Sequence, residues 1–164
     1  MPNILVVDDD EDLHLWLEQV LSQQNYTYAG VYSGDTVVND LKLGGVDLVL
    51  IDYDLPRLDG LSLLRQIQDS NIKTPCIIMT ANSAQNVAVQ CFRNGAVDFI
   101  AKPLDPDYLQ IIIERALASH AGHLRNMAYR ALAFVKHKED CIHGDNRERC
   151  NCGLREVIDG IRDF

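Results

Sequence analysis

Four short apolar segments of this chain each end in polar residues that carry a charge or a hydroxyl group. These residues are Asp8 and Asp9, Asp52, Thr80, and Lys102, which Pro103 follows. In an open parallel α/β sheet the carboxyl ends of the strands share one edge, and ligands usually bind there. We therefore expect three carboxylates, one hydroxyl group and one ammonium group to meet in a single cleft.

The spacing of apolar residues predicts the fold around that cleft. A length of 164 residues is enough for one domain and an appendage. Helical patterns separate five apolar runs, which predict strands at about 3–8, 27–31, 47–52, 75–80 and 97–101. Ser33 is expected to cap the second helix, Gly44-Gly45 to end it, and Asn94-Gly95 to end the fourth. Five β-α units predict an α/β fold, a doubly wound five-stranded parallel sheet with right-handed crossovers.

Charge and composition exclude several classes of function. The net charge is −9, with −10 in residues 1–119 and +1 in residues 120–164, so nucleic acid is not an expected partner. The sequence contains no apolar run of 18 residues, so we expect no membrane span. The first strand begins almost at once, so we expect no signal peptide. Five cysteines without a secretory signal indicate a reducing compartment, so we expect a cytoplasmic location.

The polar residues at the strand ends are suited to phosphoryl chemistry. Mg²⁺ prefers hard oxygen ligands, and clustered carboxylates repel one another unless a cation lies among them. With the metal bound, Asp52 could act as a nucleophile and form an acyl phosphate, while Lys102 and Thr80 contact phosphoryl oxygens. The acids that follow, Asp10 to Asp12, are expected to be solvated or to cap a helix. Cys76 and Cys91 are expected in the core, and His14 on an exposed helix face.

Four motifs in this order resemble the receiver domain of bacterial two-component response regulators over residues 2–119. They are Val6-Val7-Asp8-Asp9, Ile51-Asp52-Tyr53-Asp54-Leu55-Pro56 with Asp59-Gly60, Thr80-Ala81, and Asp98-Phe99-Ile100-Ala101-Lys102-Pro103. The resemblance implies a flavodoxin-like, receiver-type fold. It also implies that Asp52 accepts a phosphoryl group from a sensor histidine kinase or a phosphotransfer protein. Catalysis would be limited to self-phosphorylation and slow autodephosphorylation, so the chain is not expected to be an enzyme.

The same resemblance implies roles for individual residues. Asp9 and Asp52 would bind Mg²⁺ directly, Asp8 would act mostly through water, and the backbone carbonyl of Asp54 would complete the protein ligands. Lys102 and Pro103 would be joined by a cis peptide bond. Thr80 would move toward the phosphoryl group and the ring of Phe99 would swing inward. This change would alter the surface formed by the fourth helix, the fifth strand and the fifth helix.

Residues 120–164 form a separate helical extension in this interpretation. The helix that starts near Asp105 could continue to about Lys138 on a seven-residue apolar repeat and pack against a partner. The alternative is two helices broken at Gly122, because glycine weakens a helix interior. A continuous helix would offer a surface for homodimerisation.

A polar segment beyond this helix carries closely spaced cysteines. His137, Cys141, Cys150 and Cys152 have the number and chemistry of a tetrahedral zinc site, with His143 as a rival ligand. We expect a structural Zn²⁺ that closes a small hairpin. Free thiols and a redox-sensitive pair are the alternatives.

Three functions of the whole chain follow from this organisation. The first is a phosphorylation-dependent switch whose docking or dimerisation surface changes when Asp52 is modified. The second is a phosphoryl sink or relay with a merely structural tail. The third is a small nucleic-acid-binding output in the tail, which the near-neutral charge of residues 120–164 disfavours.

Overall fold

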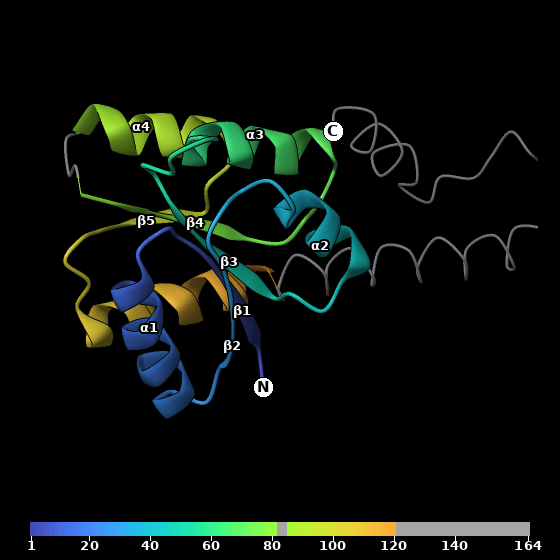
Figure 1. Ribbon diagram of the computed structural model, residues 1–164. Helices are drawn as coiled ribbons and strands as arrows, with labels where there is room; N and C mark the ends of the chain where they lie inside the picture. Colours follow the sequence, from blue (N-terminus) through green and yellow to red (C-terminus); the bar gives the residue numbers. More distant parts are fainter. Residues whose placement is uncertain (82–84, 121–164) are drawn as a thin grey trace, which may run out of the picture. The chain divides into compact units, whose positions relative to one another are not determined.

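The computed structural model describes residues 1–81 and 85–120, which form a parallel sheet covered by helices (Figure 1). The sheet order is β2-β1-β3-β4-β5, and each neighbouring pair is parallel. The predicted strands are confirmed to within one residue at each end, as β1 (Asn3–Val7), β2 (Thr27–Val31), β3 (Leu48–Asp52), β4 (Cys76–Thr80) and β5 (Asp98–Ala101). The order reverses direction at β1, which lies between β2 and β3 and so forms a switch point.

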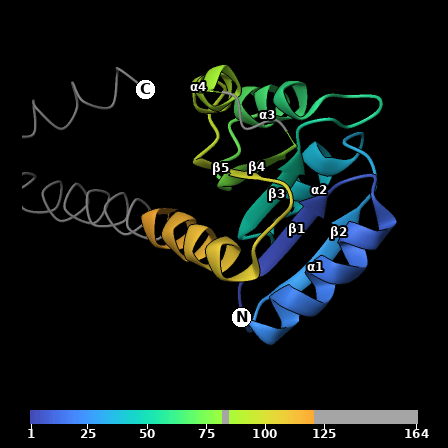
Figure 2. The ribbon, with the colours of Figure 1, turned by 90° about the vertical axis from the view of Figure 1, so that its left-hand side faces the viewer.

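Helices cover both faces of the sheet (Figures 1 and 2). One face carries α2 (Val37–Leu43), α3 (Gly60–Asp69) and α4 (Gln85–Arg93), and the other carries α1 (Glu11–Gln23) and a helix over residues 106–120. Successive strand side chains point to opposite faces, so Leu5 and Val7 pack in one core while Ile4 and Val6 pack in the other. An apolar core therefore packs on each face of the sheet. Because the inner strands are buried on both faces, their sequences are unbroken apolar runs.

Strand register brings the polar ends together. Val7 pairs with Ile51, so the next residues, Asp8 and Asp52, lie at the same sheet edge. On the other side of β3, Asp52 pairs with Met79, the residue before Thr80. The register therefore places Asp8, Asp52 and Thr80 at one edge of the sheet, as the sequence predicts.

The caps predicted for the first two helices have different outcomes. Asp10 accepts hydrogen bonds from the backbone N–H groups of Asp12 and Leu13 at the start of α1, which confirms the capping role expected for an acid there. The predicted cap of α2 is wrong, because α2 begins after Thr36 rather than Ser33. The hydroxyl of Ser33 instead donates to Asp35 within the preceding turn, 3.4 Å away.

Helix ends and core cysteines agree with the sequence. The C-cap of α2 is Gly44, and α4 ends at Arg93, immediately before Asn94-Gly95. Cys76 and Cys91 are both buried, and burial raises the pKa of Cys76 to about 12. Both thiols are therefore core side chains.

His14 contradicts the prediction of an exposed helix residue, since only 3% of its surface is accessible. It shares the buried face of α1 with Leu17 and Leu21, three and seven positions further on. The helical period alone places residue 14 on this face, so its polarity misled the prediction.

Several predictions concern residues beyond the described part of the chain. These are the continuation of the last helix past residue 120, the break at Gly122 and the whole tail. Within residues 1–81 and 85–120, no helix is long and apolar enough to cross a membrane.

The cap of α3 gives a test of the fold. Asp59 accepts from the backbone N–H of Ser62 at 2.9 Å and from its hydroxyl at 2.7 Å. We expect Asp59→Ala to lower the free energy of unfolding by ~1 kcal/mol at pH 7, measured by urea denaturation. Asp59→Asn is the matched control, because its amide oxygen can still accept.

The effect should depend on pH. Hydrogen bonds from Ser62 lower the pKa of Asp59 below its ordinary value of 3.8. Its charge-dependent contribution is therefore fully present above pH 3.8 and is lost as the pH falls through the lower folded value. The gap between wild type and Asp59→Ala should narrow in acid, and a gap that widens there would contradict this account.

Candidate functional site

Three carboxylates lie together at the carboxyl edge of β1 and β3. Asp8, Asp9 and Asp52 each offer an oxygen atom, and these atoms lie within 4.8 Å of one another. Asp8 is completely buried and Asp52 is 4% exposed, whereas Asp9 is exposed to solvent. The cluster thus has two buried acids and one acid that faces the solution.

Lys102 holds the two buried acids. Its Nζ lies 2.8 Å from Oδ2 of Asp8 and 2.7 Å from Oδ1 of Asp52. The remaining oxygens accept backbone hydrogen bonds, because Asp10 N donates to Oδ1 of Asp8 and Asp54 N donates to Oδ2 of Asp52, both at 3.0 Å. Each buried carboxylate therefore has both oxygens paired.

The ionisation of the site follows from burial and these pairs. Burial raises the pKa of Asp52, and the hydrogen bond and charge of Lys102 oppose the rise without cancelling it. Burial also disfavours the ammonium of Lys102, but the two carboxylates outweigh it and raise the pKa of Lys102. Lys102 consequently stays charged at neutral pH.

Lys102 lies in the segment that follows β5. Its backbone N–H donates to the carbonyl of Thr80 at 2.8 Å, which ties the end of β5 to the end of β4. Thr80 is completely buried at that edge. The peptide bond between Lys102 and Pro103 is cis, as the family resemblance implies.

Gly60 allows the loop after β3 to lie close to the end of that strand. A Cβ atom at this position would lie 2.2 Å from the carbonyl oxygen of Asp52, so only glycine fits. The backbone N–H of Gly60 donates to the carbonyl of Tyr53 at 3.0 Å. Asp54 lies between these residues and is exposed.

Phe99 connects the site with the surface of α4. It lies on β5, is partly buried, and packs against the core that includes α3 and α4. Its ring meets that of Phe92 edge to face, with 5.9 Å between centroids. Phe92 is half exposed, so the contact joins an inner ring to an outer one.

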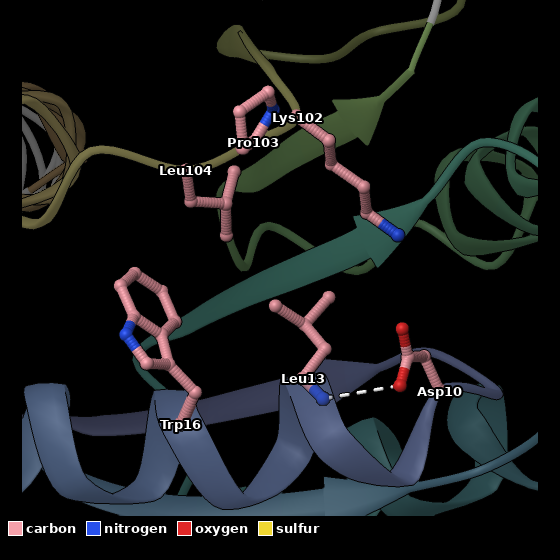
Figure 3. Close-up of a pocket in the computed structure, with 6 residues that line it drawn as sticks. All are labelled: Asp10, Leu13, Trp16, Lys102, Pro103 and Leu104. Carbon is pink, nitrogen blue, oxygen red and sulfur yellow. Dashed lines mark hydrogen bonds between the residues drawn. The ribbon is translucent and has the colours of Figure 1, made fainter.

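A pocket opens beside Lys102 (Figure 3). One wall is formed by the start of α1, with its cap residue Asp10 and the side chains of Leu13 and Trp16. The opposite wall is the segment Lys102-Pro103-Leu104. Its walls combine apolar side chains with one acid and one ammonium group. Sequence reasoning did not find this pocket, because it depends on how α1 lies against a segment some 90 positions away.

Of the predicted site residues, the structure brings Asp8, Asp9, Asp52 and Lys102 together at the strand ends. Thr80 is the last residue of β4, the neighbour of β3, and Phe99 lies on β5, one strand further from the acids. The predicted zinc ligands all lie outside the described residues; they are His137, Cys141, Cys150 and Cys152, with His143 as the rival ligand. Sequence reasoning missed His14, whose ring contacts the backbone of Asp8.

The donor set fits Mg²⁺. Three carboxylates supply hard oxygens from two adjacent strands, and the exposed position of Asp9 leaves the cluster open to solvent. Mg²⁺ typically binds one or two carboxylates and keeps several waters, which this arrangement allows. Lys102 balances part of the negative charge of the cluster.

Comparison with known proteins assigns the family. The family model of the response regulator receiver domain matches residues 4–114. This chain belongs to that family. Receiver domains are signalling switches that act with histidine kinases or phosphotransfer proteins and bind Mg²⁺ through acidic residues, and here Asp8, Asp9 and Asp52 form such a cluster.

Individual relatives agree with the assignment. The chain is 40% identical to the transcriptional regulatory protein ZraR of Salmonella typhimurium over 116 residues, which is 71% of this chain and 26% of ZraR. It is 36% identical over 117 residues to the DNA-binding transcriptional regulator NtrC of that organism, covering 71% of this chain and 25% of NtrC. The chain thus spans about a quarter of the length of these relatives.

Solved structures show the same fold. The receiver domain of a Francisella response regulator superposes with a TM-score of 0.69 at 26% identity, covering 73% of this chain and 98% of that one. NtrX from Brucella abortus superposes with a TM-score of 0.72 at 30% identity, covering 79% of this chain and 30% of NtrX. These likenesses confirm the predicted receiver-type parallel sheet.

The ion pairs of Lys102 generate a stability prediction. Lys102→Met leaves two buried carboxylates without a counter-charge, so we expect it to lower the free energy of unfolding without Mg²⁺ by ~2–3 kcal/mol. Fully buried pairs cost ~3–5 kcal/mol when broken, and the side chain of Lys102 is 23% exposed. Added Mg²⁺ should stabilise Lys102→Met more than wild type in urea titrations.

The exposed Lys73 provides the matched control for this experiment. Lys73→Met should leave both the stability and its Mg²⁺ dependence close to those of wild type. Equal stabilisation of Lys102→Met and wild type by Mg²⁺ would show that Lys102 does not balance the charge of the acids.

Proposed function

We propose that this chain is a phosphorylation-dependent signalling switch in which Asp52 is the phosphoryl acceptor. The observation that carries the proposal is the meeting of three carboxylates with Lys102 at the sheet edge where β1 and β3 end. Among these acids Asp52 is the one on the central strand β3, between the other acids and the segment that carries Lys102. Membership of the receiver family supports the same reading.

The proposed reaction transfers a phosphoryl group to a carboxylate. A carboxylate oxygen of Asp52 bonds to phosphorus as the bond between phosphorus and the imidazole nitrogen of a phosphohistidine breaks, and the imidazole leaves. Asp8, Asp9 and Asp52, with the backbone carbonyl of Asp54, would hold Mg²⁺, which would neutralise charge on the transferred group. Lys102 would leave Asp52 to pair with a phosphoryl oxygen, and Thr80 would donate a hydrogen bond to another.

We propose that the phosphohistidine protein docks over the pocket beside Lys102. Leu13, Trp16 and Leu104 line it with apolar surface within reach of the site (Figure 3). A docked protein would bury this apolar surface and direct a phosphohistidine toward Asp52. The identity of that partner depends on residues outside the pocket as well.

The output is proposed to run through β5 to α4. Once Thr80 has moved toward the phosphoryl group, Phe99 can turn inward and leave its contact with Phe92. Val89 and Val97 lie on the same region and are 45% exposed, so a change there alters an apolar surface. This link favours a docking switch over a simple phosphoryl sink, because a sink needs no path to the surface.

The tail enters this proposal as an added element. We propose that residues 120–164 extend the docking surface, with a structural Zn²⁺ on their cysteines and histidines and homodimerisation through the long helix as hypotheses. Native mass spectrometry of the full chain, with metal counted before and after phosphorylation, tests both. A zinc count that is unchanged in Cys150→Ser with Cys152→Ser would remove these two ligands from the hypothesis.

Asp52→Asn gives the direct test of the acceptor. Incubation with acetyl phosphate and Mg²⁺ should add one phosphoryl mass to wild type, measured by intact-mass spectrometry, and none to Asp52→Asn. Asp54→Asn is the matched control, because Asp54 is an exposed acid two positions away. Phosphorylation of Asp52→Asn at the wild-type rate would place the acceptor elsewhere.

Thr80→Ala separates acceptance from switching. We expect this variant to gain the phosphoryl mass while the amide signals of α4 and β5 in ¹H–¹⁵N spectra shift much less than in phosphorylated wild type. Thr74→Ala, near the other end of β4, is the control that should shift as wild type does. Wild-type shifts in Thr80→Ala would show that the hydroxyl does not transmit the signal, and rapid phosphate loss with no shifts in wild type would favour the sink.

A further inference from the structure

His14 of α1 is buried against the backbone of Asp8, the first acid of the cluster. Its Nε2 is 2.8 Å from the backbone carbonyl oxygen of Asp8, and its Nδ1 contacts the hydroxyl of Tyr28. Its ring packs against that of Tyr32, with 4.5 Å between centroids. The proposed phosphoryl transfer assigns no part to any of these three residues.

The partners fix the hydrogen positions of the imidazole. A carbonyl oxygen only accepts, so Nε2 must carry a hydrogen and donate it to Asp8. In the neutral imidazole Nδ1 then carries no hydrogen and accepts from the hydroxyl of Tyr28. Burial, followed by the nearby Tyr32 and Glu18, raises the pKa of Tyr28 to about 12, so its hydroxyl keeps the proton at neutral pH.

The sequence leaves room for this arrangement at Gly30. A Cβ atom at position 30 would lie 2.1 Å from the hydroxyl oxygen of Tyr28 and 2.8 Å from Nδ1 of His14. The missing side chain is what allows Tyr28 to reach across β2 to the imidazole. His14 of α1 and Tyr28 of β2 therefore form a hydrogen-bonded pair that contacts the backbone of Asp8, and Gly30 leaves the space for it.

Asp8 is held from several directions. Lys102 and the N–H of Asp10 hold its carboxylate, the carbonyl of Val31 accepts from its N–H at 3.2 Å, and His14 holds its carbonyl. The carbonyl of Asp8 belongs to the planar peptide that leads into Asp9. Fixing that plane therefore fixes the N–Cα bond of Asp9, the bond about which its exposed side chain is oriented.

We propose that His14 is a positioning residue for Mg²⁺ binding, which acts by holding the Asp8–Asp9 peptide through Nε2–H, with Tyr28 and Gly30 orienting its ring. The proposal rests on the proposed function only in that Mg²⁺ is the ligand of the acids. Without the bond from His14, the peptide plane can turn and Asp9 no longer points steadily at the metal. Residues that orient metal ligands typically contribute ~10–100-fold to metal affinity.

The test is a Mg²⁺ titration of His14→Leu and His14→Gln. Trp16 is the single tryptophan and lines the pocket with Lys102, so its fluorescence reports on the site. We expect the dissociation constant of His14→Leu to rise ~10-fold, the lower end of the range, because His14 acts through a backbone carbonyl. Glutamine can place an amide N–H where Nε2–H lies, so His14→Gln should stay within about twofold of wild type.

Two further variants keep His14 and therefore test the hydrogen-bonded pair if His14→Leu fails to fold. Gly30→Ala displaces the hydroxyl of Tyr28, and Tyr28→Phe removes it, so each should weaken Mg²⁺ binding about threefold, between the effects of the two His14 substitutions. A merely structural role would lower the free energy of unfolding and leave the Mg²⁺ dissociation constant unchanged. Unchanged Mg²⁺ binding in folded His14→Leu, or in both Gly30→Ala and Tyr28→Phe, would overturn the proposal.

Spectroscopy provides a second readout that does not depend on phosphorylation. Long-range ¹H–¹⁵N spectra should show the His14 tautomer with hydrogen on Nε2 in wild type. The amide signal of Asp9 should move in His14→Leu and return toward its wild-type position in His14→Gln. The Nδ1–H tautomer in wild type would refute the assignment. Failure of acetyl phosphate to modify Asp52 would refute the proposed function but leave the Mg²⁺ titrations interpretable.

Discussion

The candidate site of this receiver domain depends on one interaction, in which the ammonium of Lys102 pairs with the carboxylates of Asp8 and Asp52. Two buried carboxylates a few ångströms apart repel each other strongly unless a cation lies with them. Lys102 supplies that cation from the segment after β5, the edge strand of the sheet. The strands that frame the site, β1, β3 and β5, are thereby joined through their charged ends as well as through backbone hydrogen bonds.

The same interaction explains how the site could change state. Lys102 neutralises part of the charge of the acids, a task that a bound divalent cation would share. A phosphoryl group on Asp52 would then attract the ammonium away from the carboxylate. Thr80 and Lys102 are linked by a backbone hydrogen bond at the ends of β4 and β5. In the proposed switch, this bond would couple movement of Thr80 to Lys102 and, along β5, to Phe99.

Two glycines allow close backbone and side-chain approaches near the acids. Gly60 lets the loop after β3 approach the backbone of Asp52, and Gly30 lets Tyr28 reach His14. In both places a missing Cβ allows a close approach near the acidic cluster. The site is thus defined by backbone positions as much as by its charged side chains, and changes at these glycines should alter function without touching a charged group.

The sequence alone determined the five strands, their parallel arrangement and the meeting of Asp8, Asp9 and Asp52 with Lys102, because apolar runs and strand-end polar residues are local signals. Only the tertiary structure decided what lies next to them. His14 was misjudged because a polar side chain suggested exposure, although helical period placed it with Leu17 and Leu21. The cap of α2 at Thr36 and the pocket between α1 and Leu104 depend on loop geometry and long-range packing. Such features arise from contacts between distant segments, which local patterns do not encode.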